Sequence, residues 1–125
     1  MDKQTFTAPD AAPPVGPYSP AVGVGELVFL SGQVALDADG RLAAITAPDQ
    51  TRKAMENMRL LLAAAGLTFE NVVKTTIFLT DMEDFAAVNE VYGKFFTPPY
   101  PARSTVQVGA LPKNAKVEIE AVAAR

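Results

Sequence analysis

The sequence predicts an α+β fold in which two helices cover one face of a mixed β-sheet. Two helical apolar stripes alternate with short runs rich in Val, Ile, Thr and Phe, in the order strands, helix, strand, helix, strands. A chain of 125 residues is the length of one domain, so we expect a single domain over residues 1–125. Because two helices cover only one sheet face, we expect the other face to meet a partner subunit.

Two segments carry the helical pattern. The first is expected over residues 48–65, with Gly66 as its stop, and its apolar face consists of Ala54, Met58, Leu61, Leu62 and Ala65. The sequence Thr80-Asp81-Met82-Glu83 matches a capping box and predicts the start of the second helix. The apolar stripe of that helix consists of Phe85, Val88, Tyr92 and Phe95.

Strand patterns occupy four other segments, which are residues 27–32, 71–79, 103–108 and 116–123. Asp39-Gly40 is typical of a hairpin turn, and residues 111–114 predict the bend before the last strand. The segment 8–20 carries five prolines, so it can only be extended or turning, and we expect a surface loop there.

The composition excludes several kinds of chemistry. The chain has no cysteine and no histidine, so it cannot contain a disulfide, a catalytic thiolate, a Ser-His-Asp triad or a zinc site with these ligands. No acidic cluster has the spacing of a calcium loop, and we expect no metal. The net charge of −3 and the pI of about 4.8 argue against nucleic acid as a partner, since phosphate contacts need basic side chains.

Nothing in the sequence predicts a membrane or a secreted protein. The first residues, Met1-Asp2-Lys3-Gln4, do not form a basic region followed by an apolar one, so we expect no signal peptide. No apolar run approaches the roughly 20 residues that a membrane-spanning helix needs. We therefore expect a cytoplasmic protein.

Arg103 is the first candidate site residue. It opens a strand directly after a Pro-rich turn, and its guanidinium offers a fork of donors that suits a carboxylate. Strand alternation places Thr105 and Gln107 on the same face as Arg103. The alternative is an ordinary surface or ion-pair arginine.

Glu118 and Glu120 are the acidic candidates, because they share one face of the last strand. A carboxylate on an interior strand is costly unless it is paired or used. The alternative is that both glutamates face solvent or pair with lysines.

Four further residues carry weaker signals. Tyr18 follows Gly16-Pro17 in a turn that can present its ring outward. Ser31-Gly32 ends a strand, where glycine either lets a backbone N–H approach a ligand or simply breaks the strand. Asn89 lies one turn after Phe85, and its amide is either a structural hydrogen-bonding group or a site residue.

In combination these segments resemble the YjgF/RidA family of reactive-intermediate deaminases, also described as endoribonuclease L-PSP. The resemblance covers residues 12–125. The motifs that carry it are Gly16-Pro17-Tyr18-Ser19, Ser31-Gly32-Gln33, Val73-Lys74-Thr75-Thr76, Phe85-Ala86-Ala87-Val88-Asn89, Pro101-Ala102-Arg103-Ser104 and Glu118-Ile119-Glu120-Ala121.

The resemblance implies a chorismate-mutase-like fold and a homotrimer with a ligand cleft at each subunit interface. It implies hydrolysis of 2-imino acids, such as 2-iminobutanoate and 2-iminopropanoate, or of their enamine tautomers, to 2-keto acids and ammonia without a cofactor. By the same resemblance, Arg103 grips the substrate carboxylate and Glu118 positions or activates water. Tyr18, Ser31 and Asn89 match other cleft residues, and Gly32 and Thr105 match positions whose backbone groups touch the ligand.

One residue departs from the family pattern. Many relatives carry cysteine where this chain has Thr105, which removes thiol chemistry. Hydrolysis of an imine needs only the addition of water to an electrophilic carbon, so a covalent nucleophile is not required.

Two other functions are weighed against the deaminase. A regulatory module could use the same cleft to sense a 2-keto acid, although sensing would need only Arg103 and not Glu118. A ribonuclease is opposed by the absence of histidine and by the acidic pI of about 4.8.

Overall fold

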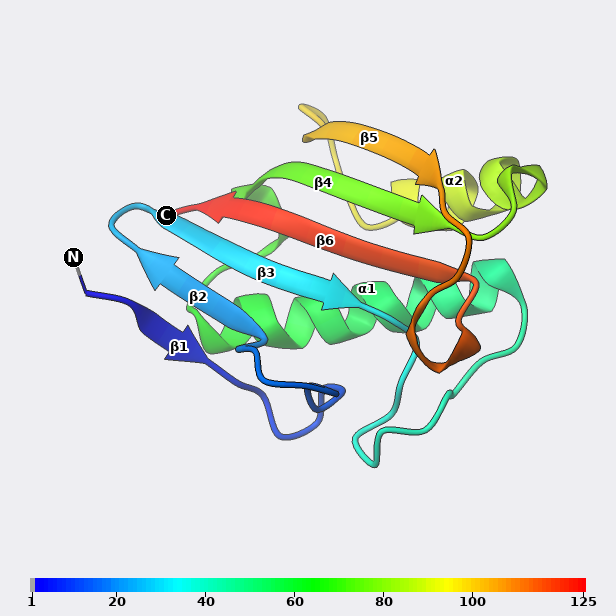
Figure 1. Ribbon diagram of the computed structural model, residues 1–125. Coiled ribbons are helices and arrows are strands. Elements are labelled where there is room, and N and C mark those ends of the chain that lie inside the picture. The colour runs from blue at the N-terminus through cyan, green and yellow to red at the C-terminus, as the bar shows by residue number, and fades with distance from the viewer. Residues whose placement is uncertain (1) are drawn as a thin grey trace.

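The computed structural model, described here for residues 2–125, is built on a six-stranded β-sheet with two helices on one of its faces (Figure 1). The strands are β1 (Gln4–Phe6), β2 (Ala21–Val24), β3 (Leu27–Gln33), β4 (Val72–Leu79), β5 (Ala102–Gln107) and β6 (Val117–Ala124). The helices are α1 (Ala47–Ala64) and α2 (Phe85–Gly93), and three 3₁₀ turns are η1 (Phe69–Asn71), η2 (Met82–Asp84) and η3 (Pro112–Asn114). The predicted α+β architecture is confirmed.

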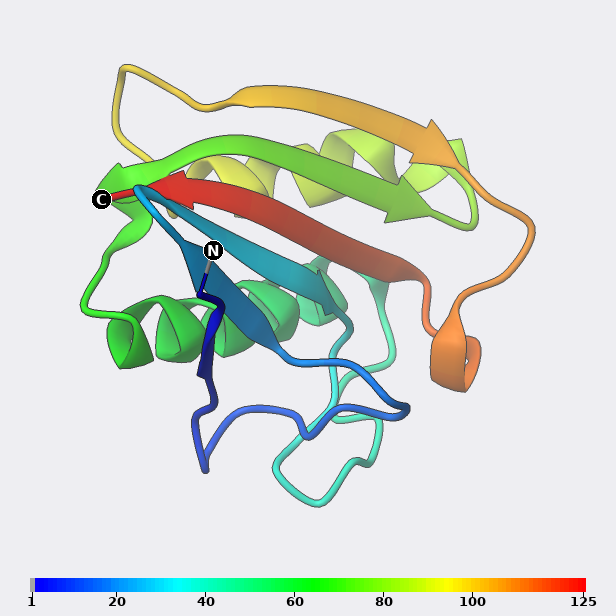
Figure 2. The same cartoon turned by 60° about the vertical axis from the view of Figure 1, so that its left-hand side comes forward.

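The sheet is mixed. Its strand order is β1-β2-β3-β6-β4-β5, and every neighbouring pair is antiparallel except β4 and β5, which are parallel. Parallel neighbours need a crossover connection, and η2 and α2 supply it between β4 and β5 (Figure 2). This crossover keeps α2 close to the β5 edge of the sheet.

Helix α1 forms as its sequence predicts. The side chain of Thr46 accepts a hydrogen bond from the backbone N–H of Asp49, and Pro48 occupies the first turn, where its missing N–H costs nothing. The predicted apolar face is buried, and Gly66 follows the helix with a φ of +76° that favours glycine. None of the helices in residues 2–125 is long and apolar enough to cross a membrane.

The expected start of the second helix is wrong. Thr80 is not its cap, because Asp81 accepts a hydrogen bond from the N–H of Glu83 and so begins the short turn η2 instead. The backbone N–H of Thr80 donates to the carbonyl of Lys116. The helix proper begins only at Phe85 and ends at Gly93, which leaves Phe95 beyond it.

Two strands were not predicted, β1 and β2. Each is only three or four residues long, and they flank the Pro-rich loop that the sequence does predict. Strands β2 and β3 form a hairpin whose turn contains Gly25 with a φ of +58°. This hairpin extends the sheet beside β6 and brings the Pro-rich loop to the end of β3.

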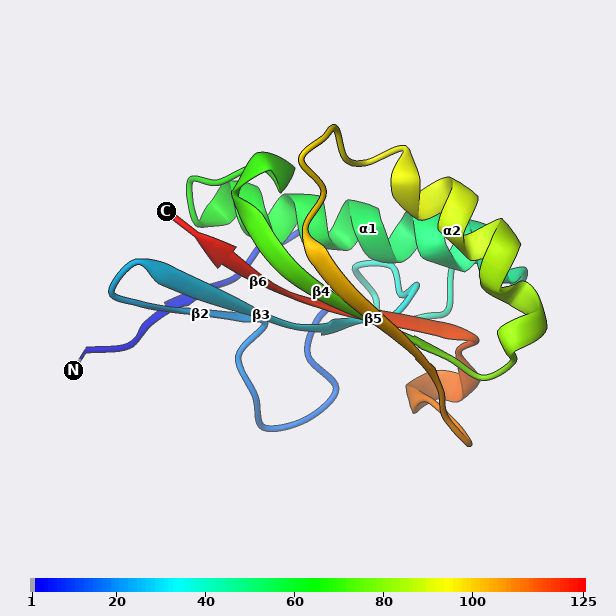
Figure 3. The same ribbon diagram turned by 90° about the horizontal axis from the view of Figure 1, so that it is seen from above.

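Within residues 2–125 no α-helix covers the other face of the sheet, where only the Pro-rich loop and the turn η3 lie (Figure 3). Along β3, Val28 and Leu30 are buried beneath the helices, whereas Leu27 and Phe29 point to the open face and are 40% and 44% exposed. Val106 of β5 is similarly exposed, at 41%. Large apolar side chains gathered on one open sheet face are typical of an interaction surface.

Two buried amide side chains of α1 fix the segments that enter and leave the central strands. Asn57 donates from Nδ2 to the carbonyls of Val34 and Leu36, which follow β3. Gln50 accepts the N–H of Lys116, the residue before β6, at 2.7 Å. Both amides are almost completely buried, so these hydrogen bonds replace water for backbone groups that would otherwise be unpaired.

We predict that Asn57→Leu lowers the free energy of unfolding by about 1–3 kcal/mol, because buried carbonyls lose their donor. Urea denaturation at one fixed protein concentration measures the change. Glu56→Gln, an exposed neighbour on the same helix, is the control. A loss under about 0.5 kcal/mol, the range of ordinary surface substitutions, would contradict the role given to Asn57.

Candidate active site

The seven predicted site residues form two groups on opposite faces of the sheet. Asn89, Arg103 and Thr105 lie on the face that the helices cover, and we call them the Arg103 half-site. The other group, the Glu118 half-site, lies at the open face and consists of Tyr18, Ser31, Gly32 and Glu118. One chain therefore does not bring Arg103 and Glu118 together.

The strand register establishes this separation. Ile77 of β4 pairs with Thr105 of β5 on one side and with Ile119 of β6 on the other. Directly paired residues point to the same face, so Thr105 shares the buried face of Ile119. Glu118 precedes Ile119 and must point the opposite way, as the predicted alternation requires.

Gly32 allows the Glu118 side chain to lie against β3. A Cβ atom at position 32 would fall 2.6 Å from Oε2 and 2.9 Å from Cγ of Glu118, which is closer than carbon and oxygen atoms can approach. A side chain at this position would therefore push the Glu118 side chain away from β3. Gly32 thus lets Glu118 keep its place against β3 in the packing of one chain.

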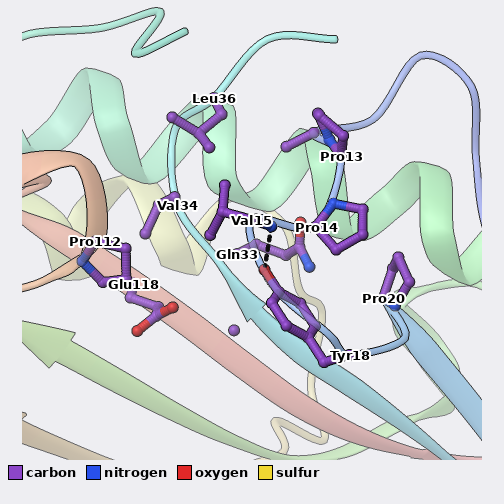
Figure 4. A pocket seen from close by; sticks show the side chains of 12 residues that line it. Pro13, Pro14, Val15, Tyr18, Pro20, Gln33, Val34, Leu36, Pro112 and Glu118 are labelled. Atoms are coloured by element: carbon purple, nitrogen blue, oxygen red, sulfur yellow. Dashed lines mark hydrogen bonds between the residues drawn. The ribbon is translucent and has the colours of Figure 1, made fainter. Parts of the chain in front are cut away.

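Ser31 and Tyr18 belong to the same half-site through the Pro-rich loop. The Ser31 hydroxyl donates to the carbonyl of Ser19 at 2.7 Å, and its backbone N–H donates to the carbonyl of Pro20. These bonds hold the loop at the end of β3. The Tyr18 hydroxyl accepts the N–H of Val15 at 3.2 Å, and the ring faces the same hollow as Glu118 (Figure 4).

Glu118 is half-buried and has no ion-pair partner among residues 2–125. Burial raises the pKa of its carboxyl, and the nearby charge of Glu120 raises it further. Glu120 itself is exposed, as the alternative interpretation expected for both glutamates. The other part of that alternative, pairing with lysines, is wrong for the described residues 2–125, where neither glutamate forms an ion pair. Glu118 therefore titrates closer to neutrality than an ordinary glutamate, which suits a group that exchanges protons.

Arg103 is the centre of the other half-site. Its Nη1 donates to Oδ1 of Asn89 at 2.6 Å, and its Cζ lies 5.6 Å from the ring centre of Phe85 and 5.1 Å from that of Tyr92. No carboxylate of residues 2–125 pairs with it. Most of its donors are consequently available to an anionic ligand.

An open cavity of about 480 Å³ borders the guanidinium. Its lining consists of Asn89, Tyr92, Gly93, Tyr100, Pro101 and Arg103. Aromatic rings with a single cation among them suit a small ligand that has one carboxylate and an apolar portion.

Thr105 lies two residues after Arg103 on the same face of β5. Its hydroxyl oxygen is buried and has no hydrogen-bond partner among residues 2–125. The side chain thus offers no exposed polar group to the cavity. Among residues 2–125, no cluster of three metal-ligating side chains is present near either half-site or elsewhere.

The sequence reasoning missed the roles of Phe85 and Tyr92. Both were assigned to the apolar stripe of the second helix, but with Asn89 they follow the spacing i, i+4 and i+7 and so contact one arginine from one helix face. That spacing beside a strand arginine was the available signal.

The fold and the Arg103 half-site define a small α+β protein whose open cavity borders an arginine and so suits an anionic ligand. Comparison with known proteins identifies its family. The family described as Endoribonuclease L-PSP matches residues 9–125. The chain therefore belongs to this family, also known as YjgF/RidA.

Individual relatives are similar along nearly their whole length. Protein DfrA of Myxococcus xanthus is 50% identical, over 98% of this chain and 96% of its own. The 2-iminobutanoate/2-iminopropanoate deaminase of Homo sapiens is 46% identical, over 95% of this chain and 85% of its own. The crystal structure of Escherichia coli TdcF with bound serine has a TM-score of 0.92 and 42% identity, and the match covers 98% of both chains. The family thus includes hydrolytic deaminases and proteins that bind small molecules.

We predict that Thr105→Val raises the free energy of unfolding by about 1 kcal/mol, because it replaces an unpaired buried hydroxyl by a methyl group of the same shape. Thermal or urea unfolding at fixed protein concentration measures the gain. Thr51→Val is the control, since the buried Thr51 hydroxyl is bonded to the carbonyl of Ala47 and its loss should destabilise. Destabilisation by Thr105→Val would mean that its hydroxyl has a partner.

We predict that the stability difference between Glu118→Gln and the wild type depends on pH. The folded chain has the higher Glu118 pKa, so wild-type stability falls as the pH rises through that value, whereas the amide does not titrate. The variant should gain most at neutral pH and least below the ordinary carboxyl pKa. Urea titrations over this pH range, with Glu56→Gln as control, would show a constant difference if Glu118 were unperturbed.

Proposed function

We propose that this protein hydrolyses 2-imino acids, such as 2-iminobutanoate and 2-iminopropanoate, and their enamine tautomers to 2-keto acids and ammonia. The observation that carries the proposal is Arg103, a guanidinium without an acidic partner beside an aromatic cavity. The human relative named for these substrates supports it, as does TdcF, whose bound serine is a small molecule with a carboxylate.

We further propose that the working site joins two subunits of a homotrimer. Each half-site lacks what the other has, since one offers a cation for a carboxylate and the other a partly buried carboxyl beside Tyr18. The apolar open face, with Leu27 and Phe29, supplies a surface for subunit contact. Sedimentation of a folded, active monomer would contradict this assembly.

In the proposed reaction, Arg103 holds the substrate carboxylate and Glu118 directs a water molecule to the imine carbon. Water adds to the carbon of the protonated C=N bond, one of its protons passes to the Glu118 carboxylate, and a neutral carbinolamine with an amino group forms. Glu118 then gives this proton to the amino nitrogen, and the C–N bond breaks as ammonia leaves. The carbinolamine hydroxyl loses its proton to the Glu118 carboxylate as the C=O bond of the 2-keto acid forms. One water is consumed for each ammonia released. A carboxyl with a raised pKa suits these proton transfers.

A 2-keto acid sensor is the alternative that uses the same cleft. It would need Arg103 but not a desolvated carboxyl, and the burial of Glu118 therefore favours the enzyme. A ribonuclease, which the family description suggests, is disfavoured by the net charge of −3 and the absence of histidine. Salt-dependent binding of RNA to the purified protein would support the ribonuclease alternative.

The direct test couples the protein to a threonine dehydratase and follows keto-acid release while semicarbazide traps free imine. Faster keto-acid formation and less trapped imine are expected when the protein is present. A sensor would bind 2-oxobutanoate but leave both quantities unchanged.

We predict that Arg103→Ala lowers kcat/KM by about tenfold to a hundredfold or more, because a charge-assisted contact to the carboxylate is lost. Arg103→Lys should recover only part of the activity, since it lacks the planar fork. Arg52→Ala is the control, because Arg52 forms an exposed ion pair with Asp49 on α1. A wild-type rate for Arg103→Ala in the coupled assay would exclude Arg103 as the anchor.

We predict that Glu118→Gln lowers kcat by about a hundredfold while the Kd for 2-oxobutanoate changes little, because the amide can hold water but cannot accept its proton. Glu120→Gln, on the same strand face but exposed, should have a smaller effect. Stopped-flow rates and calorimetric binding separate the two quantities. The reverse ranking of the two variants would refute the assignment of Glu118.

A further inference from the structure

Tyr92 lies between the core and the arginine, and the proposed reaction does not use it. The residue is 5% exposed and belongs to the buried face of α2. Its hydroxyl shares a hydrogen bond of 2.7 Å with the hydroxyl of Thr75, which is also buried. Thr75 pairs directly with Arg103 across β4 and β5. The hydroxyl end of the Tyr92 ring is thus held by Thr75, next to the backbone of Arg103, and the face of the same ring contacts the Arg103 guanidinium.

The three groups that contact the Arg103 guanidinium are not equally fixed. Phe85 is 36% exposed, and the hydrogen bond from Arg103 to Asn89 is exposed to solvent. Water can compete for the amide, and an exposed ring can change rotamer. Of the three groups, only Tyr92 is both buried and held by a buried hydrogen bond. Its ring centre lies 5.1 Å from Cζ of Arg103, which is closer than the ring centre of Phe85.

The contact is one between a cation and a neutral ring. Burial raises the pKa of Tyr92, although the Thr75 hydrogen bond and the charge of Arg103 act in the opposite direction. The phenol therefore keeps its proton at neutral pH. The neutral Tyr92 ring packs against the flat face of the Arg103 guanidinium and leaves the N–H donors at its edge free for a carboxylate.

We propose that Tyr92, held by Thr75, is a positioning residue that orders the Arg103 guanidinium before a carboxylate ligand arrives. A free arginine loses considerable rotamer freedom when it binds, and ordering it in advance removes that loss from the binding equilibrium. The proposal concerns the carboxylate-binding part of the proposed active site and rests on it for the identity of the ligand.

Three variants separate the ring from its hydrogen bond. Tyr92→Leu removes the ring contact, and Tyr92→Phe and Thr75→Val each remove only the hydroxyl pair. Thr51→Val is the matched control, because it deletes a buried threonine hydrogen bond in α1 that has no contact with Arg103. If Tyr92→Leu fails to fold, the other two variants still test the proposal.

The first measurement is the NMR order parameter of the Arg103 side-chain Nε–H group in the ligand-free protein, assigned with Arg103→Lys. It should be high in the wild type and in Thr51→Val, and lower in all the Tyr92 and Thr75 variants. Equal order parameters in wild type, Tyr92→Phe and Thr75→Val would overturn the proposal. This readout needs no substrate, so it is independent of the proposed reaction.

The second measurement is calorimetric binding of 2-oxobutanoate and of its uncharged methyl ester. Tyr92→Leu should weaken carboxylate binding about tenfold, and the hydroxyl variants about two- to fivefold, with little change for the ester. In the Arg103→Ala background these losses should vanish. Equal losses with and without Arg103 would overturn the proposal. If the wild type binds no 2-oxo acid while the order parameters behave as expected, the proposed function fails and the positioning role stands.

Discussion

The position of β4 between β5 and β6 is the constraint on which the arrangement of both half-sites depends. The register pairs Ile77 of β4 with Thr105 of β5 and with Ile119 of β6. The side chains of Thr105 and Ile119 therefore point to the same sheet face, the one that the helices cover. Arg103 must then face the helices, and Glu118 must face away from them. A shift of either strand by one residue would put both side chains on one face and would also expose the core residues of that strand.

Keeping the two groups apart preserves the reactivity of each. An adjacent arginine would lower the pKa of Glu118 and occupy the donors that a substrate carboxylate needs. In this chain the carboxyl instead keeps a raised pKa through burial, and Arg103 contacts an amide and two aromatic rings. The cost is that a single chain holds only half of each proposed site. The exposed apolar face of the sheet, and the subunit contact that we propose there, follow from the same layer arrangement.

Much of this arrangement could be predicted from local sequence patterns. The alternation in residues 103–108 and 116–123 placed the side chains of both strands on their observed faces, and the stripe from Ala54 to Ala65 identified the buried face of α1. These features depend on periodicity within one element. The short strands β1 and β2 were not predicted because three or four residues are too few to show an alternating pattern. The capping box at Thr80 predicted the wrong helix start because Asp81, and not Thr80, caps the turn that follows. The close approach of Gly32 to Glu118 and the stacking of Tyr92 on Arg103 depend on contacts between distant segments, which no local pattern contains.

The most direct test of the central claim is complementation between two variants of low activity, Arg103→Ala and Glu118→Gln. The two proteins are unfolded, mixed in equal amounts and refolded, and mixing is verified by mass spectrometry. If each cleft takes Arg103 from one subunit and Glu118 from another, random assortment should leave about a quarter of the clefts intact, and about a quarter of the wild-type deaminase activity should return. Each variant refolded alone should keep only its own low activity, well below that of the mixture. Mixed oligomers without any recovered activity would place both residues in a site formed by one chain and would contradict the account.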